Sequence, residues 1–499
     1  MTIEEPDVKV YQLFDINDVF ELKNNIPYFV NMEKSFFDLS KQFSFPVSIV
    51  HETYYVDRTF RDSYYTYFAS KHFTVEKNCQ RIAIFETCFD INDFYDESKH
   101  LTIQNHFIGT IVIKPLIEGT WGRTLIDPSK LNKKPFFVRT TLYDVIINGV
   151  NLQINAYPFS SQDTETMTCA ETSIWTMLDY YGTRYPEYRT VQPSDIISEV
   201  NLSSDERVLP SHGLSYLQKS NLLKKFGFSP RVYEREKYGD TLTKKIFHYY
   251  VESGIPVTIS LNGHSTVCIG HSDFETNIQS VNAEYNIDGI NFYDSSDFCS
   301  DYVIIDDNQI PYVIETYDHF SVHQNSKQLV RFTVPLYKRI FLEASDAKGI
   351  FDITVENLFS IHHIKTYVSS FGINTTNPII KRMFLTSSRK FKSFRIANAY
   401  SANESQYYSK LPFPKFVWVL ELSSVLNYET ECFGEIVLDA TSGRFSGLNS
   451  IILIRVGNYF AYRMPYEMLD DLLYRLMYTI DIRESIKQYV NNLRLGGKK

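Results

Sequence analysis

The sequence has few of the residues that mark specialised architectures. Among its 499 residues only six are cysteine, 18 are proline and 20 are glycine. The cysteines form no C-x-x-C pair and follow no regular spacing, which excludes a disulfide framework and a zinc ribbon. No apolar run reaches the roughly 18 residues that a transmembrane helix needs, so we expect no membrane insertion.

Positive charge is also in deficit. Lysine and arginine total 50 against 59 aspartate and glutamate residues, for a net charge of −9. Because nucleic-acid binding needs a clustered basic face, we expect no nucleic-acid partner. The H-E-x-x-H motif is absent and no histidine–cysteine cluster has ligand spacing, so we predict no metal and no cofactor. The first residues are acidic and contain no apolar signal core, which favours a reduced, cytoplasmic location.

Aromatic residues, in contrast, are abundant. The chain has 37 Phe and 36 Tyr, while its 43% hydrophobic and 22% charged content matches ordinary globular usage. Such aromatic content favours β-strands. The chain is too long for one hydrophobic core, and changes of pattern divide it into three predicted domains. We expect an α+β fold with a β-rich α+β domain at 1–155, a middle domain at 156–322 and an α+β domain with a terminal helix at 323–499.

The two outer domains carry recognisable elements but no recognisable site. Short β-branched runs at Arg81–Phe85 and Phe107–Leu116 predict strands. Asn148-Gly149 lies between two alternating runs and predicts a β-hairpin. The C-terminal domain shows further strand-like runs, and leucines at helical spacing predict a final helix from Tyr466 to about Leu493.

The middle domain has helices first and strands afterwards. The predicted helices are Cys169–Tyr181, ended by Gly182, then Leu214–Phe226 and Thr241–Ser253, and the predicted strands are Val257–Leu261, Ser265–Gly270 and Asp301–Ile305. The residues with recognisable chemistry lie at the ends of these elements.

A polar loop leads into Cys169 at the predicted start of the first helix. Thr168 and Glu171 stand in the S/T-x-x-E relation of a capping box, so we expect Thr168 as the N-cap and Cys169 as the first helical residue. A thiol there feels the positive end of the helix dipole, which favours the thiolate. The pattern is typical of a cysteine nucleophile, and a small buried structural cysteine is the alternative interpretation.

A nucleophilic cysteine needs a base, and the base needs an orienting group. His264 follows the tight Asn262-Gly263 turn and opens a strand, which places its imidazole at the rim of the sheet. The strand from Tyr302 ends in Asp306 and Asp307, and either carboxylate could accept the Nδ1–H of His264 and fix its tautomer. A structural histidine and an ordinary acidic turn are the alternatives.

In this order the three elements resemble the papain-like cysteine peptidases, and most closely their bacterial branch related to the bacteriocin-processing peptidases. The features that carry the resemblance are Gln162, Cys169–Ala170, Gly254–Val257, His264 with Gly270, and Tyr302–Asp307. They cover about a third of the chain and leave both outer domains unexplained. Ala170 replaces the glycine that usually follows the cysteine, and extra residues separate the histidine strand from the aspartate strand.

The resemblance implies a papain-like core for residues 156–322, with a catalytic triad of cysteine, histidine and aspartate. Cys169 is then the nucleophile and His264 the base and acid. Asp307 is the orienting residue, with Asp306 as the alternative.

The resemblance also assigns Gln162 to the oxyanion hole. Gln162 stands one residue further from Cys169 than the family pattern requires, so that either this loop bulges or Asp163 intrudes. An anionic Asp163 in that position could not stabilise an oxyanion.

We therefore expect an intracellular hydrolase that cleaves a peptide or isopeptide bond of a protein or peptide substrate through a thioester. Deamidation or acyl transfer by the same triad is an alternative, and so is a catalytically silent domain that binds or senses a partner. A regulatory protein partner suits each of these, because the outer domains carry no site. The tail Leu493-Arg-Leu-Gly-Gly-Lys-Lys499 resembles one that many papain-like enzymes cleave, but we expect a frayed terminus there.

Overall fold

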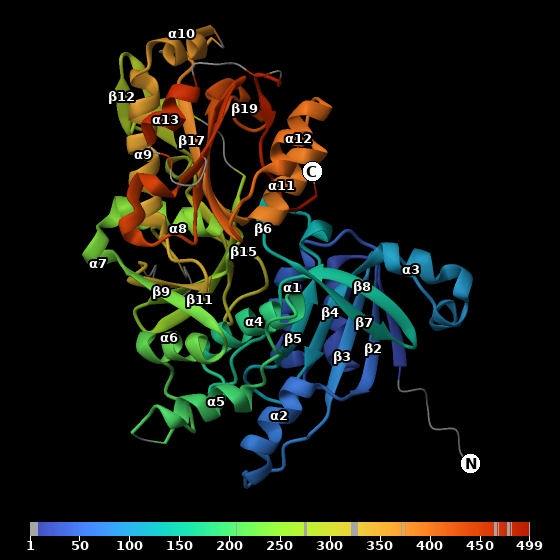
Figure 1. Cartoon of the computed structure of the whole chain (residues 1–499). Coiled ribbons are helices and arrows are strands. Elements are labelled where there is room, and N and C mark those ends of the chain that lie inside the picture. Colours follow the sequence, from blue (N-terminus) through green and yellow to red (C-terminus); the bar gives the residue numbers. More distant parts are fainter. Residues whose placement is uncertain are drawn as a thin grey trace.

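The computed structural model describes residues 8–498, with gaps at 206, 274–276, 321–327, 371, 375, 464–466, 468, 477–479 and 481. Its mixture of helices and strands confirms the α+β class. Figure 1 shows the N-terminal part in blue, the middle part in green beside it, and the C-terminal part in orange and red above the middle part. Within the described residues no helix is long and apolar enough to cross a bilayer.

The N-terminal part is built on an antiparallel sheet in the order β1-β2-β3-β4-β5. Its elements are β1 (Val8–Leu13), α1 (Glu33–Ser40), β2 (Val47–Tyr55), α2 (Arg58–Thr66), β3 (Cys79–Phe85), α3 (His100–His106), β4 (Phe107–Ile113) and β5 (Trp121–Ile126). A hairpin of β7 (Thr141–Ile147) and β8 (Val150–Ala156) packs on this sheet through a shared hydrophobic cluster. Its turn residues Asn148 and Gly149 have φ of 44° and 85°, so the predicted hairpin is confirmed, with both residues in the left-handed conformation of a type I′ turn.

The middle part is built on a second sheet, in the order β15-β14-β11-β10-β16-β9, with β6 paired to β11 and β24 paired to β6. Its strands are β6 (Phe136–Val138), β9 (Phe228–Glu234), β10 (Val257–Leu261), β11 (His264–Ser272), β14 (Asp301–Ile305), β15 (Val313–Thr316), β16 (Arg331–Tyr337) and β24 (Arg494–Gly496). Its helices are α4 (Cys169–Arg184), α5 (Pro193–Leu202), α6 (Tyr216–Lys225), α7 (Arg235–Tyr238) and α8 (Asp240–Glu252). The predicted order of helices before strands holds only in part, because the unpredicted strand β9 lies between α6 and α8 and β6 precedes α4.

The C-terminal part contains a third sheet, in the order β12-β13-β17-β18-β20-β21-β22, in which β13 and β17 run parallel. Its strands are β12 (Tyr285–Ile287), β13 (Ile290–Asp294), β17 (Ile379–Ser387), β18 (Phe416–Ser424), β20 (Gly434–Asp439), β21 (Ile451–Val456) and β22 (Tyr459–Tyr462), with a separate pair of β19 (Glu431–Cys432) and β23 (Ile486–Lys487). The helices around it are α9 (Ala344–Ser360), α10 (His362–Ser370), α11 (Ser388–Ala397), α12 (Ala402–Lys410) and α13 (Leu469–Arg475).

The sheets do not follow the boundaries predicted at 155 and 322. β6 comes from the first predicted domain and β24 from the last, yet both join the sheet of the middle part, while β12 and β13 leave it for the third sheet. Gly270 in β11 makes the β6 crossing possible. It pairs with Val138, and a Cβ on Gly270 would lie 1.9 Å from the carbonyl oxygen of Phe137.

The predicted terminal helix is wrong over most of its length. Helix α13 covers only Leu469–Arg475, and the described chain beyond it forms β23 and β24; Tyr466 lies outside the described residues. Pairing of the tail with β19 and β6 therefore outcompetes the helical spacing of the leucines. The expected frayed terminus is also wrong. Gly496 packs against the ring of Phe136, and the N–H of Lys498 donates to Leu131.

The sequence predicted that Gly182 ends the first helix, and this prediction is wrong. Helix α4 continues to Arg184. A Cβ on Gly182 would lie 2.7 Å from the carbonyl oxygen of Arg189. The glycine thus serves a close backbone approach within the helix and is not its C-terminal stop.

Candidate active site

Cys169, His264 and Asp306 meet where three elements end. Cys169 is the first residue of α4, His264 the first of β11, and Asp306 directly follows β14. Ser173, one turn into α4, holds the first two elements together, because its Oγ lies 2.7 Å from the carbonyl oxygen of Cys169 and 3.0 Å from that of Ser265. The start of α4 is thereby fixed beside the start of β11.

The helix begins at Cys169 as predicted, but the predicted capping box does not form. Thr168 is the N-cap, yet its hydroxyl donates to the side chain of Glu171 and accepts no backbone N–H. Glu171 is buried, and its other carboxylate oxygen accepts a hydrogen bond from Ser211 at 2.5 Å. As the first helical residue, Cys169 has an N–H that no carbonyl of its own helix can accept, and this N–H is part of the positive end of the helix dipole.

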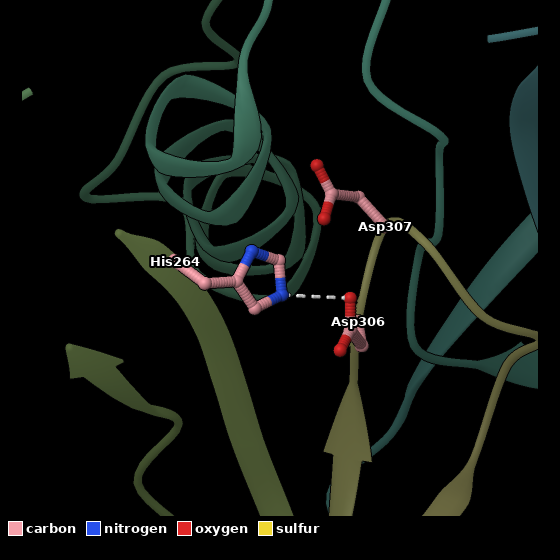
Figure 2. Close-up of side chains that lie close together, drawn as sticks. All are labelled: His264, Asp306 and Asp307. Carbon is pink, nitrogen blue, oxygen red and sulfur yellow. Dashed lines mark hydrogen bonds and ion pairs between the residues drawn. The ribbon is translucent and has the colours of Figure 1, made fainter. Parts of the chain in front are cut away.

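Asp306 is the carboxylate that pairs with His264. The Nε2 of His264 lies 3.0 Å from Oδ1 of Asp306, and both side chains are buried (Figure 2). Of the two carboxylates named in the sequence analysis, the alternative Asp306, and not the preferred Asp307, contacts the imidazole. The bonded nitrogen is also Nε2 and not the expected Nδ1, because the ring turns its Nδ1 edge away from Asp306.

His264 keeps its proton to a pH well above the ordinary range of histidine. Burial disfavours the charged imidazole, but hydrogen bonds with Asp306 and Cys169 outweigh it and raise the pKa of His264 to about 10. The pKa of Asp306 is lowered, because the hydrogen bond and charge of His264 outweigh the effect of burial. Two further donors support this carboxylate, the N–H of Asn308 at 3.0 Å and the amide of Gln309 at 3.3 Å. At neutral pH the site therefore holds an imidazolium beside the thiol.

Asp307 occupies a different environment. Its side chain is only 6% exposed, and neither carboxylate oxygen has a hydrogen-bond partner among the described residues. Burial, and then the charge of Asp306, raise the pKa of Asp307 to about 8. Figure 2 shows its carboxylate on the imidazole side of the loop that follows β14.

Gln162 reaches the site from the loop before α4. Its Nε2 donates to Oδ1 of Asn308 at 2.7 Å, so the structure brings this amide to the loop that carries Asp306. Asp163 does not intrude, because its carboxylate accepts the backbone N–H groups of Glu165, Thr166 and Met167. The loop is therefore held by its own acidic side chain.

Residues of the N-terminal part contact the loop that carries Gln162. Gly119, in the β4–β5 connection, has φ +67°, and a Cβ on it would lie 2.0 Å from the carbonyl oxygen of Gln162. Lys114, at the end of β4, is buried and donates to the carbonyl of Ser161 at 3.1 Å. The first predicted domain thus contributes directly to the shape of the site.

Lys219 is a site residue that the sequence analysis missed. It lies on α6, is 2% exposed, and its Nζ donates to the hydroxyls of Ser260 at 2.7 Å and Ser265 at 3.2 Å. Burial lowers the pKa of Lys219 to about 8, against an opposing effect of Cys169. A lysine on an amphipathic helix ordinarily faces solvent, so no local signal distinguishes this one.

The same place offers ligands for a cation. One ligand atom each from His264, Asp306 and Asp307 lie within 4.8 Å of one another. The sequence analysis predicted no metal, because the chain has no H-E-x-x-H motif and no histidine–cysteine cluster with ligand spacing. An imidazole with two carboxylates is a donor set that suits a borderline or hard divalent ion.

Comparison with known proteins adds no family to this description. No family model matches the chain, and no match was found among curated proteins or solved structures.

Proposed function

We propose that the protein is a papain-like cysteine hydrolase that cleaves an amide bond in a protein or peptide. The observation that carries the proposal is the position of His264 between Asp306 and Cys169. One ring nitrogen is held by a carboxylate, and the other is left for the thiol. This is the arrangement by which a thiol is activated and its base is oriented.

The reaction follows from these positions. The Cys169 thiolate attacks the carbonyl carbon of the amide. His264 lies beside it in its protonated form during this step. The N–H of Cys169 and the amide of Gln162 stabilise the oxyanion, which requires Gln162 to exchange its bond with Asn308 for one with the substrate. His264 then protonates the leaving amine as the C–N bond breaks, and water hydrolyses the thioester to release the acid and restore the thiol.

Alkylation of Cys169 by iodoacetamide tests the ion pair. Cys88 is exposed, so the measurement is made in a Cys88→Ser background. The remaining cysteines are buried, and burial raises the pKa of each thiol: Cys79, Cys268, Cys299 and Cys432. We expect rapid alkylation below pH 7, and in His264→Ala a profile that rises near the free-thiol pKa of about 8.5. Identical profiles would remove the proposed catalytic pair.

Cleavage itself is tested with a peptide library read by mass spectrometry. We expect cleaved products from the unmodified chain, none from Cys169→Ser, and no effect of a chelator. A reactive Cys169 that yields deamidated or acyl-transfer products would replace hydrolysis by one of those reactions. A reactive Cys169 without any product would contradict the proposal and support a binding module.

A further inference from the structure

A second cavity lies at the junction of the middle and C-terminal parts, away from Cys169. It has a volume of about 480 Å³ and is bordered by the C-terminal ends of α4 and α8 and by the start of α11. Because Cys169 begins α4 and Tyr181 near its other end lines the cavity, the two sites are separated by on the order of 20 Å.

Positive charge in this cavity is not matched by negative charge. The lining residues include Arg139, Arg389, Lys390 and Lys415, whereas Glu187 is the only carboxylate among the described residues that line it. Glu187 is exposed and pairs with Lys415 at 4.0 Å, so it neutralises the rim and not the interior.

Arg139 shows the imbalance in the interior. It is 6% exposed, and its guanidinium donates to the hydroxyls of Tyr180 at 2.5 Å and Tyr185 at 2.9 Å and to the carbonyl of Asn492. None of these acceptors is a carboxylate, and no carboxylate pairs with this arginine among the described ion pairs. A buried guanidinium that no carboxylate neutralises is costly, so the cavity favours an added anion.

Lys390 adds a second cation that is available to a ligand. Its Nζ has no hydrogen bond or ion pair with a described residue, and burial followed by the charge of Arg139 lowers the pKa of Lys390 to about 8. It lies in the first turn of α11, where Ser387 caps the N–H of Lys390. The first N–H groups of this helix add partial positive charge at the same wall. These cations act on Tyr185 as well. They outweigh the effect of burial and lower the pKa of its phenol to about 7.

Part of the cavity lining is aromatic. Tyr337 stacks on Phe416 with ring centroids 5.1 Å apart, and the ring of Tyr185 meets Tyr337 edge-on at 5.7 Å. All three residues line the cavity. Aromatic walls hold planar rings by stacking, and pockets of this volume bind small organic molecules.

We propose that this cavity binds a small organic phosphate that carries a planar ring, such as a nucleoside monophosphate. The phosphate contacts Arg139 and Lys390 near the start of α11, and the ring packs against Tyr185, Tyr337 and Phe416. Charge-assisted hydrogen bonds from a guanidinium and an ammonium are the usual means of holding a phosphate. The inference is independent of the proposed hydrolase activity, because no residue of the triad lines the cavity.

Isothermal titration of the full chain with adenosine 5′-monophosphate tests the proposal, with adenosine and inorganic phosphate as separate arms. We expect saturable binding of the monophosphate and weaker binding of either fragment. Lys390→Gln weakens binding by about tenfold, the value of one charge-assisted hydrogen bond. Lys392→Gln on the same helix is the matched control and leaves binding unchanged, because its Nζ donates to the carbonyls of Ser409 and Leu411.

Two results would overturn the assignment. The first is the absence of saturable binding of the monophosphate to the full chain. The second is equal binding by Lys390→Gln and by the unmodified chain. Inorganic phosphate that binds as tightly as the monophosphate would overturn the role of the aromatic wall, which Tyr185→Leu tests directly. Lys390 is partly exposed and makes no side-chain bond, so its replacement leaves the fold intact, and a thermal unfolding curve checks this.

Discussion

Asp306 and Asp307 are neighbours in the chain, yet their carboxylates have opposite surroundings. Asp306 accepts three hydrogen bonds, one of them from a charged imidazole, and its pKa is lowered. Asp307 has none among the described residues, and its pKa is raised to about 8. Asp306 is therefore charged, whereas Asp307 is a neutral acid below about pH 8.

Replacing each aspartate by asparagine separates their roles. Asp306→Asn removes the charge that keeps His264 protonated, so we expect alkylation of Cys169 at pH 6.5 to slow by about tenfold or more. Asp307→Asn is the matched control and keeps the His264–Asp306 bond, so the rate should stay within a factor of about two. The reverse order of effects would restore Asp307 as the orienting residue.

We also expect Asp307→Asn to change how the stability of the folded chain depends on pH. In the folded chain Asp307 holds a proton up to about pH 8, whereas its ordinary pKa is 3.8. The folded state therefore binds the extra proton within this window, and the contribution of Asp307 to stability is lost as pH rises through it. We expect Asp307→Asn to raise the thermal midpoint relative to the unmodified chain more at pH 9 than at pH 4.5. A difference that does not change with pH would contradict the raised pKa.

At the scale of elements, backbone contacts at glycine decide how the loops around the site pack. Gly119 lets the β4–β5 connection touch the carbonyl of Gln162, and Gly270 lets β6 cross β11. Each contact joins segments that are distant in the chain. A local pattern shows the glycine but not the segment that it meets.

Gly119→Ala tests the support of the Gln162 loop. The added Cβ collides with that carbonyl, and the left-handed φ is itself unfavourable, so we expect a loss of roughly 1–2 kcal/mol of stability. Amide cleavage should fall as Gln162 is displaced. Gly443→Ala is the control, since nothing lies within 4 Å of its added Cβ. Equal thermal midpoints for the two variants would contradict the close approach.

At the scale of the whole molecule, side chains and strands cross between the three sheets. Glu252 on α8 accepts hydrogen bonds from His271 in β11 and from Arg382 in β17, and Arg382 also bonds Glu421 in β18. β24 then returns the end of the chain to β6. The middle and C-terminal parts are thus joined by a buried ionic network and by the last described strand.

Deleting residues 494–499 removes that strand. We expect a lower thermal midpoint and faster cleavage by an added protease near β6, because the backbone groups of Phe136–Val138 lose their partner on that side. Deleting Lys499 alone is the control. An unchanged midpoint in the longer deletion would show that the tail contributes nothing to the fold.

The sequence by itself determined the α+β class, the β7–β8 hairpin, strands β10 and β14, and the start of α4 at Cys169. These features depend on the spacing of apolar residues and on turn chemistry, which neighbouring residues encode. It also placed Cys169, His264 and the aspartate pair at the ends of elements, and their catalytic roles stay a prediction.

Only the tertiary structure decided which atoms meet. It chose Asp306 and Nε2, brought Lys219 near Cys169, and formed strand β23 within the predicted terminal helix. Each choice depends on how residues far apart in the chain pack and pair. Local periodicity leaves such contacts open, because the free energy of a hydrogen bond across a sheet depends on both of its partners.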